Sequence, residues 1–88
     1  MNTLKNNRKV ESGKIFNAYF EACENDKLDR VIVEKGPPFG RGYWAEEYTS
    51  FEWNGKTFAV LGYDHYNGHF SGFTDRAAIY GLYIAEVV

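Results

Sequence analysis

The sequence predicts an α+β fold: one N-terminal amphipathic helix packed on a four- to five-stranded, mainly antiparallel sheet, in the order α-β-β-β-(β)-β. Three observations support this: an Asn-Gly pair between strand-forming residues, one segment with helical spacing of apolar side chains, and a length of 88 residues. A chain of this length buries only roughly 60–65% of its unfolded surface, enough for one modest core. We therefore expect a single domain over residues 1–88, with residues 1–9 as a flexible arm.

The segment from Tyr48 to Tyr63 predicts a β-hairpin with Asn54-Gly55 at its turn. A type I′ turn requires positive φ at both central residues, and Asn-Gly meets this requirement with little strain. The expected cross-strand pairs are Trp53 with Lys56, Phe51 with Phe58, Thr49 with Val60 and Tyr48 with Leu61. Because residues two apart share a face of a strand, we expect Phe51, Phe58 and Val60 to face the core.

Residues 13–25 show the spacing of an amphipathic helix. Their apolar side chains recur at i, i+3, i+4 and i+7, which places them on one face. These side chains are Phe16, Tyr19, Phe20 and Cys23, with Ile15 beside them. Ser12 stands directly before the segment, where a hydroxyl can cap the first backbone N–H groups. We expect about three helical turns that lie across the sheet.

Residues 28–35 have the alternation of a strand with one solvated face. Val31 and Val33 point to one side, and charged side chains predominate on the other. Residues 36–42 follow with two prolines and three glycines, a composition that interrupts regular structure. We expect an ordered loop there.

The last third of the chain predicts a further turn and a further strand. A second Asn-Gly pair, Asn67-Gly68, would place His65 opposite Phe70 and Gly62 opposite Phe73. Residues 77–88 are apolar on both faces and rich in Ile, Tyr and Val, so we favour a buried strand over a helix capped by Thr74 or Asp75. Its expected faces are Ile79, Tyr83 and Val87 on one side, and Tyr80, Leu82, Ile84 and Val88 on the other.

Composition indicates a cytoplasmic protein without a membrane segment. Cys23 is the single cysteine, so an intramolecular disulfide is excluded. The first nine residues are polar and lack the apolar core of a signal peptide. No run approaches the roughly 18 apolar residues of a membrane span.

The net charge of −2 conceals an asymmetry along the chain. Residues 1–14 carry a net charge of +3, and the remaining residues carry −5 because eleven acidic residues oppose six basic ones. An acidic body argues against a broad nucleic-acid interface and favours a basic protein partner. We expect several carboxylates to share one flank of the fold: Glu21, Glu24, Asp26, Asp29, Glu46, Glu47, Glu52 and Asp64.

Asp64, His65 and His69 are the one group of residues whose side chains resemble metal ligands. A two-residue turn at Asn67-Gly68 would place the two histidines on opposite faces of the sheet, where they could not bind one ion. Cys23 lies on the apolar helix face, and no nucleophile-elbow or phosphate-loop motif is present. We therefore expect no catalytic residues, no metal and no cofactor.

The leading hypothesis is a small non-enzymatic protein-binding domain with an acidic and aromatic surface. Its concrete form is an inhibitor or decoy of the phage or mobile-element type, docking onto a basic protein, for example one that binds nucleic acid. Trp, Tyr and Arg are enriched at interface hot spots, and they cluster with carboxylates at one place in this chain. The expected partner-binding residues are Phe39, Arg41, Tyr43, Trp44, Glu46 and Glu47.

Three alternatives remain open. A single-stranded nucleic-acid module could stack bases on the Phe39–Trp44 loop. A small metal-binding protein or enzyme could be built around Asp64, His65 and His69. A homodimer could form by pairing of an exposed edge strand.

Overall fold

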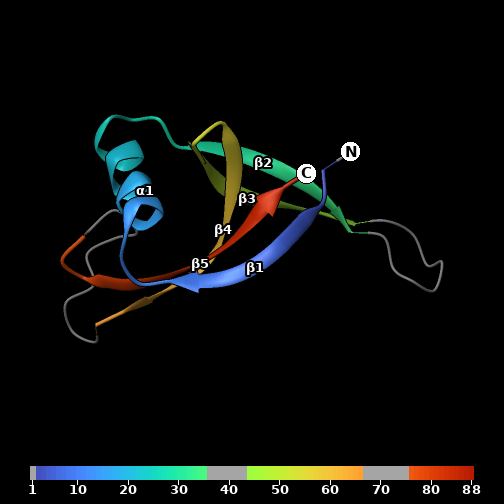
Figure 1. Ribbon diagram of the computed structural model, residues 1–88. Coiled ribbons are helices and arrows are strands. Elements are labelled where there is room, and N and C mark those ends of the chain that lie inside the picture. The colour runs from blue at the N-terminus through green and yellow to red at the C-terminus, as the bar shows by residue number, and fades with distance from the viewer. Residues whose placement is uncertain (1, 36–43, 67–75) are drawn as a thin grey trace.

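The computed structural model describes residues 2–35, 44–66 and 76–88, which form one helix and one five-stranded antiparallel sheet (Figure 1). The elements in chain order are β1 (Leu4–Val10), α1 (Lys14–Glu24), β2 (Asp29–Lys35), β3 (Trp44–Trp53), β4 (Lys56–His65) and β5 (Ile79–Val87). The strand order in the sheet is β1-β5-β4-β3-β2, so α1 connects its two edge strands. The predicted α+β class, with an N-terminal helix packed on an antiparallel sheet, is confirmed.

The helix packs its aromatic face on the sheet, as the apolar spacing predicts. Phe16, Tyr19 and Phe20 are buried, together with Ile15. The Tyr19 ring meets Phe20 edge-on at a centroid distance of 5.0 Å and Phe51 of β3 at 5.7 Å. Edge-to-face geometry is favourable for aromatic pairs, so this cluster ties α1 to the centre of the sheet.

The β3–β4 hairpin forms around Asn54-Gly55, whose φ angles of 54° and 75° are both positive, as a type I′ turn requires. Three of the four expected pairs are present: Trp53 with Lys56, Phe51 with Phe58, and Thr49 with Val60. The fourth expected pair, Tyr48 with Leu61, is wrong. The β3–β4 ladder ends at the pair Thr49 and Val60. Beyond it, Tyr48 pairs with Val31 of β2, and the register between β4 and β5 shifts at Leu61.

The N-terminal residues differ from the prediction. In place of a flexible arm over residues 1–9, Leu4–Val10 form the edge strand β1, antiparallel to β5. The backbones of Thr3 and Val88 extend this pairing with two reciprocal hydrogen bonds of 2.8 and 2.9 Å. The predicted Ser12 cap is also wrong: Gly13 occupies the N-cap position with φ 95°, and no side chain caps α1.

Strand β5 confirms the preference for a strand over residues 77–88, but its faces differ from the prediction. Ile79, Leu82 and Ile84 are buried, whereas Tyr80 and Tyr83 are exposed. Asp64 faces Gly81 and His65 faces Ile79, so β5 has one extra residue between these pairs. An extra residue of this kind is a β-bulge, and it reverses the alternation of side chains along the strand.

The expected second hairpin lies outside the described residues, because Phe70 and Phe73 of its return strand fall in residues 67–75. On the β5 side of β4, Gly62 lies opposite Tyr83 and His65 opposite Ile79. An aromatic ring covers the strand glycine from β5: Tyr83 Cδ2 lies 3.8 Å from the point where a Gly62 Cβ would stand. The 36–42 loop and the Asn67-Gly68 turn also fall outside the described residues.

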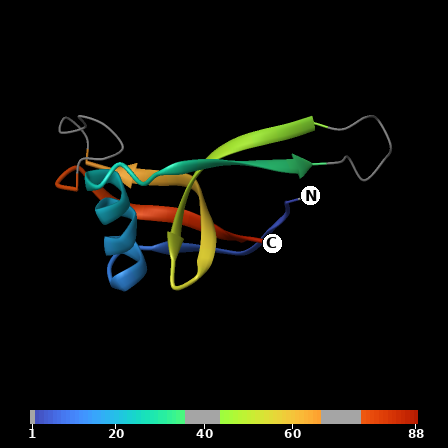
Figure 2. The same ribbon diagram turned by 90° about the horizontal axis from the view of Figure 1, so that it is seen from above.

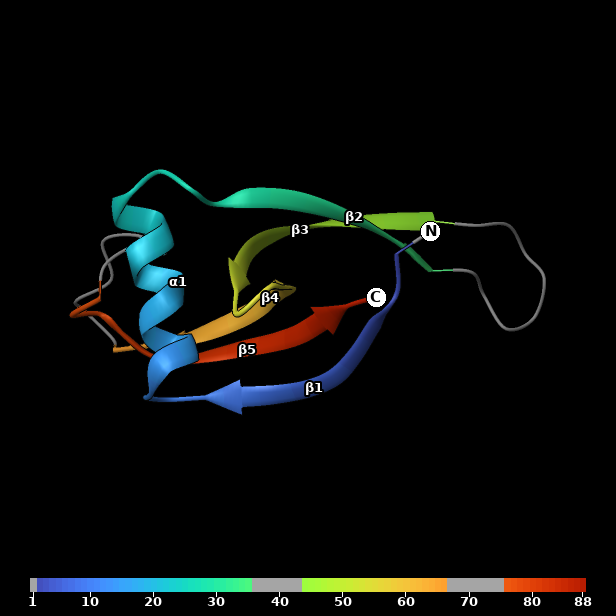
Figure 3. The same cartoon turned by 45° about the horizontal axis from the view of Figure 1, so that its top comes forward.

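The curved sheet brings its two edges together at one end. Asn2 Nδ2 donates a hydrogen bond of 3.1 Å to the Ile32 carbonyl of β2, and the start of the chain lies beside β2 in Figures 2 and 3. On the face of the sheet opposite Phe51, a row of small side chains is almost fully buried: Ser50, Ala59 and Ala85. The sheet is therefore buried on both faces near its centre.

Candidate functional site

The outer ends of β2 and β3 form a two-stranded ribbon, which we define as residues 31–35 and 44–48. Its register runs from Val31 opposite Tyr48 to Lys35 opposite Trp44, whereas the β3–β4 ladder begins only at Thr49. Within the described residues the ribbon therefore has no third strand beside β3, and it extends away from α1 in Figure 2. Two strands alone are marginally stable in water, so the ribbon depends on its attachment to the sheet.

Three of the expected partner-binding residues lie on this ribbon. Trp44, Glu46 and Glu47 are all exposed, and the exposed fraction of Trp44 is 51%. The other three expected residues, Phe39, Arg41 and Tyr43, lie outside the described residues. Because side chains alternate along a strand, Trp44 and Glu46 share one face of the ribbon, and Glu47 lies on the other.

The two ribbon carboxylates expected to bind a partner, Glu46 and Glu47, both have contacts within the chain. Glu46 Oε2 accepts a hydrogen bond of 2.5 Å from the Tyr48 hydroxyl, and Glu47 Oε1 lies 3.3 Å from an Arg30 guanidinium nitrogen. Glu47 shares its face with Ile32, whose exposed fraction is 59%. The ribbon thus presents Trp44 with Glu46 on one face, and Ile32 with the carboxylates Glu34 and Glu47 on the other.

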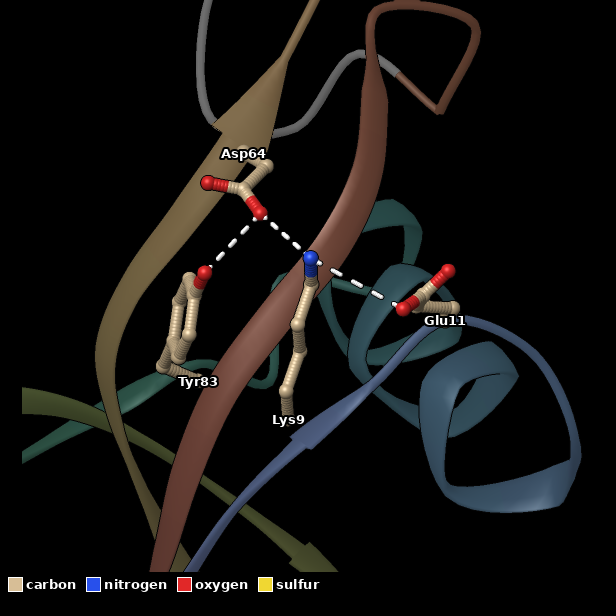
Figure 4. A network of polar contacts seen from close by, with 4 residues as sticks. All are labelled: Lys9, Glu11, Asp64 and Tyr83. Carbon is tan, nitrogen blue, oxygen red and sulfur yellow. Dashed lines mark hydrogen bonds and ion pairs between the residues drawn. The ribbon is translucent and has the colours of Figure 1, made fainter.

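Asp64 belongs to a polar network on the outer face of β1, β5 and β4, shown in Figure 4. Its Oδ2 atom lies 2.7 Å from Lys9 Nζ of β1 and accepts a 3.0 Å hydrogen bond from the Tyr83 hydroxyl. Lys9 crosses β5 at Gly81, where a Cβ atom would approach Lys9 Cε to 2.7 Å. The hydrogen bond from Lys9 holds the pKa of Asp64 below its usual value and raises the pKa of Lys9.

The structure separates the residues expected as alternative metal ligands. Asp64 lies on the outer face of β4, whereas His65 is its neighbour in the strand and lies on the opposite face, 6.0 Å from the Tyr63 ring. His69 is outside the described residues, and the described part of the chain contains no group of three metal-ligating side chains. Cys23 is half-buried on α1, where burial raises the pKa of its thiol.

A groove of about 580 Å³ lies between the second half of α1, the start of β2 and the end of β3. Three residues of the expected acidic flank line it: Glu21, Asp29 and Glu52. Lys27 and Arg30 also line it, as do the half-buried Trp53 and the buried Ser50. Sequence reasoning grouped the carboxylates but missed the groove, because its shape depends on where β2 begins relative to β3.

Comparison with protein-family models, curated proteins and solved structures finds no match for this chain. No helix in the described residues has the length and apolar character needed to cross a membrane.

Proposed function

We propose that this chain is a protein-binding domain without catalytic activity, and that it binds its partner through the ribbon. The observation that carries the proposal is the projecting pair of strands with exposed Trp44 and Ile32. Large apolar side chains rimmed by polar groups are typical of interaction sites, and tryptophan is among the commonest hot-spot residues. Val33 of the ribbon is 2% exposed, in contrast to the exposed Trp44 and Ile32.

The partner we propose is a basic protein. Residues 15–88 carry a net charge of −5. Glu46 lies on the same face of the ribbon as Trp44, and Glu47 lies on the opposite face. Complementary charge accelerates association and disfavours partners of the same sign. An inhibitor or decoy that occupies the basic surface of such a protein is the most specific form of this proposal.

Affinity capture from native lysate with nuclease treatment tests the proposal, using three forms of the tagged chain. The ribbon variant combines the substitutions Trp44→Ala, Glu46→Gln and Glu47→Gln. A matched control removes one exposed aromatic ring and two carboxylates away from the ribbon: Tyr66→Ala, Glu24→Gln and Asp26→Asn. Thermal unfolding of each form verifies that it is folded.

We expect the wild type and the control to retain the same stoichiometric basic protein after nuclease, and the ribbon variant to lose it. Equal retention by the ribbon variant would show that the ribbon is not the interface. Nuclease-sensitive material without a protein would instead support the nucleic-acid alternative, whose affinity should fall steeply with salt.

A further inference from the structure

The ribbon has an open backbone edge along β3. Strands β3 and β4 part at the pair Thr49 and Val60. Beyond that pair, β4 stays beside β5 and runs toward α1, whereas residues 44–48 of β3 stay beside β2 and run the other way (Figure 2). Among the described residues, the side of β3 that faces away from β2 therefore has no strand partner along the ribbon.

The hydrogen bonds of β2 show which backbone groups of β3 face this open side. In an antiparallel pair, residues opposite each other alternate between hydrogen-bonded and non-hydrogen-bonded pairs. The Ile32 carbonyl bonds to Asn2, outside the ladder, so Ile32 and the opposite Glu47 form a non-hydrogen-bonded pair. The next pair of this kind is Glu34 with Ala45. The N–H and C=O groups of Glu47 and Ala45 therefore point away from β2.

The β3–β4 hairpin leads independently to the same orientation. Trp53 and Lys56 close a two-residue turn as a hydrogen-bonded pair, so the Trp53 backbone groups point toward β4. Because the pattern repeats every two residues, Thr49 and then Glu47 point to the same side, and β4 has left β3 before Glu47. In the described part of the chain, the backbones of Glu47 and Ala45 bond to nothing on that side. Unpaired strand backbone of this kind is a template for a strand of another chain.

The side chains along the open edge favour a basic segment. Glu46 and Glu47 point to opposite faces of the ribbon, so a third strand would place one of its residues opposite each of them. Cross-strand pairs of opposite charge are stabilising and pairs of like charge are not, which disfavours a second copy of this chain. The Glu47 side chain remains 51% exposed beside Arg30, so it is open to a second cation. Trp44 adds apolar surface on the face of Glu46.

We propose that the basic partner binds by strand addition: an extended segment of the partner pairs with the β3 edge at Ala45 and Glu47 and makes the ribbon three-stranded. Two adjacent lysine or arginine residues of the segment lie opposite Glu46 and Glu47. Main-chain hydrogen bonds supply affinity in this mode, and the side chains supply specificity. A third strand also stabilises a ribbon that is marginal with two. This inference deepens the proposed function and rests on it for the identity of the partner class.

An NMR titration of the full isotope-labelled chain tests the inference. The probe is the blocked hexapeptide Thr-Val-Arg-Lys-Val-Thr, and the matched peptide carries N-methyl groups on Arg and Lys, which keep both charges and remove the central backbone donors. We expect the first peptide to slow amide exchange at Ala45 and Glu47, and the methylated peptide to leave it unchanged. Equal binding of both peptides, no binding of the first, or protection at Ile32 and Glu34 instead would overturn the inference.

Proline substitutions test the same edge within the chain. Ala45→Pro removes an N–H that the ladder with β2 does not use, and it places a ring where the third strand would lie. We expect peptide binding to weaken about tenfold, the upper range for one lost hydrogen bond. Glu34→Pro is the matched control, because Glu34 lies directly opposite Ala45 and its N–H faces the other edge of the ribbon. Thermal unfolding verifies that both variants are folded, and equal weakening by the two would overturn the inference.

Partner capture separates this inference from the ribbon proposal. A partner lost by the ribbon variant but fully retained by Ala45→Pro would refute strand addition and leave the ribbon standing as the interface. A partner retained by the ribbon variant, with peptide-dependent protection at Ala45 and Glu47, would refute the side-chain interface of the ribbon alone.

Discussion

At the scale of single residues, Gly81 determines whether Lys9 can reach Asp64. Lys9 lies on β1 and Asp64 on β4, so the lysine must cross β5, and it does so over the one residue there that lacks a side chain. In Gly81→Ala the new Cβ would meet Lys9 Cε at 2.7 Å. Because the end of a lysine chain moves easily, we expect Lys9 to leave Asp64 while the fold persists.

The measurable result of Gly81→Ala is a rise in the Asp64 pKa toward its ordinary value, read from the carboxyl carbon in an NMR pH titration. Gly62→Ala is the matched control, since its Cβ would meet only the Tyr83 ring at an ordinary 3.8 Å. An Asp64 pKa that is equally low in Gly81→Ala and Gly62→Ala would show that Gly81 does not control the low pKa of Asp64.

The same ion pair predicts a dependence of stability on pH. The pKa of Asp64 is lowered in the folded state, chiefly by the hydrogen bond from Lys9 and then by that from Tyr83. Its ionised form therefore stabilises the fold above the unfolded pKa, about 3.9 for Asp, and this stabilisation is lost as the pH falls through the lower folded value.

We expect urea unfolding between about pH 5 and pH 2 to show a smaller acid loss of stability for Asp64→Asn than for the wild type. The double variant Asp64→Asn with Lys9→Met should show the same dependence of stability on pH as Asp64→Asn alone, because that substitution already breaks the ion pair. Identical acid profiles for the wild type and Asp64→Asn would contradict the coupling.

At the scale of elements, the β3–β4 hairpin depends on its turn. Gly55 has φ 75°, and no atom lies within 4 Å of the point where a Cβ would stand, so Gly55→Ala would introduce backbone strain without a clash. Left-handed backbone costs an ordinary residue roughly 1–2 kcal/mol, and the free energy of unfolding should fall by about that amount. Chemical denaturation measures the change, and an unchanged midpoint would mean that the turn relaxes to another type.

The elements predicted correctly are those whose signals are local. Asn54-Gly55 determines the register of its own hairpin, and the spacing of Phe16, Tyr19 and Phe20 identifies α1 without reference to any other segment. Strand β1 could not be predicted this way: its residues are polar, and they become a strand because β5 lies beside them.

The same distinction applies to the candidate site. Trp44, Glu46 and Glu47 are candidates by their residue types alone, and the structure has all three on the surface. The groove beside Glu52 depends instead on β2 beginning opposite Ser50, a relation between two strands that composition does not contain. The predicted faces of β5 are wrong for a similar reason, because the bulge near Gly81 arises from pairing with β4.

At the scale of the whole molecule, both edges of the sheet have features that oppose pairing with another sheet. On β1 the register shifts between Lys5 and Arg8, where Asn6 has φ 57°, and both flanking side chains are basic. Bulges and charged side chains are common means of protecting an edge strand. If two copies of the chain paired through β1, Lys5 and Arg8 of one copy would lie near the same basic side chains of the other and repel them.

The edge of β2 is capped by hydrogen bonds from within the chain. The Ile32 carbonyl accepts from Asn2 Nδ2 at 3.1 Å, and the Arg30 N–H donates to Asp29 Oδ1 at 2.8 Å. These groups point away from β3 and would otherwise be available to a neighbouring strand. Within the described residues, these two hydrogen bonds occupy one carbonyl and one N–H of the β2 edge, which makes that edge a poorer template for a second sheet.

We therefore expect the wild type to sediment as a monomer across the concentration range of a sedimentation velocity experiment. Asn2→Ala removes the cap on Ile32 and should lower the concentration at which self-association begins. Asn7→Ala, which alters an exposed asparagine on β1, should not. A wild-type dimer would instead mean that an edge strand pairs despite these caps, as the homodimer alternative holds, and amide exchange protection confined to β1 or β2 would identify which edge is used.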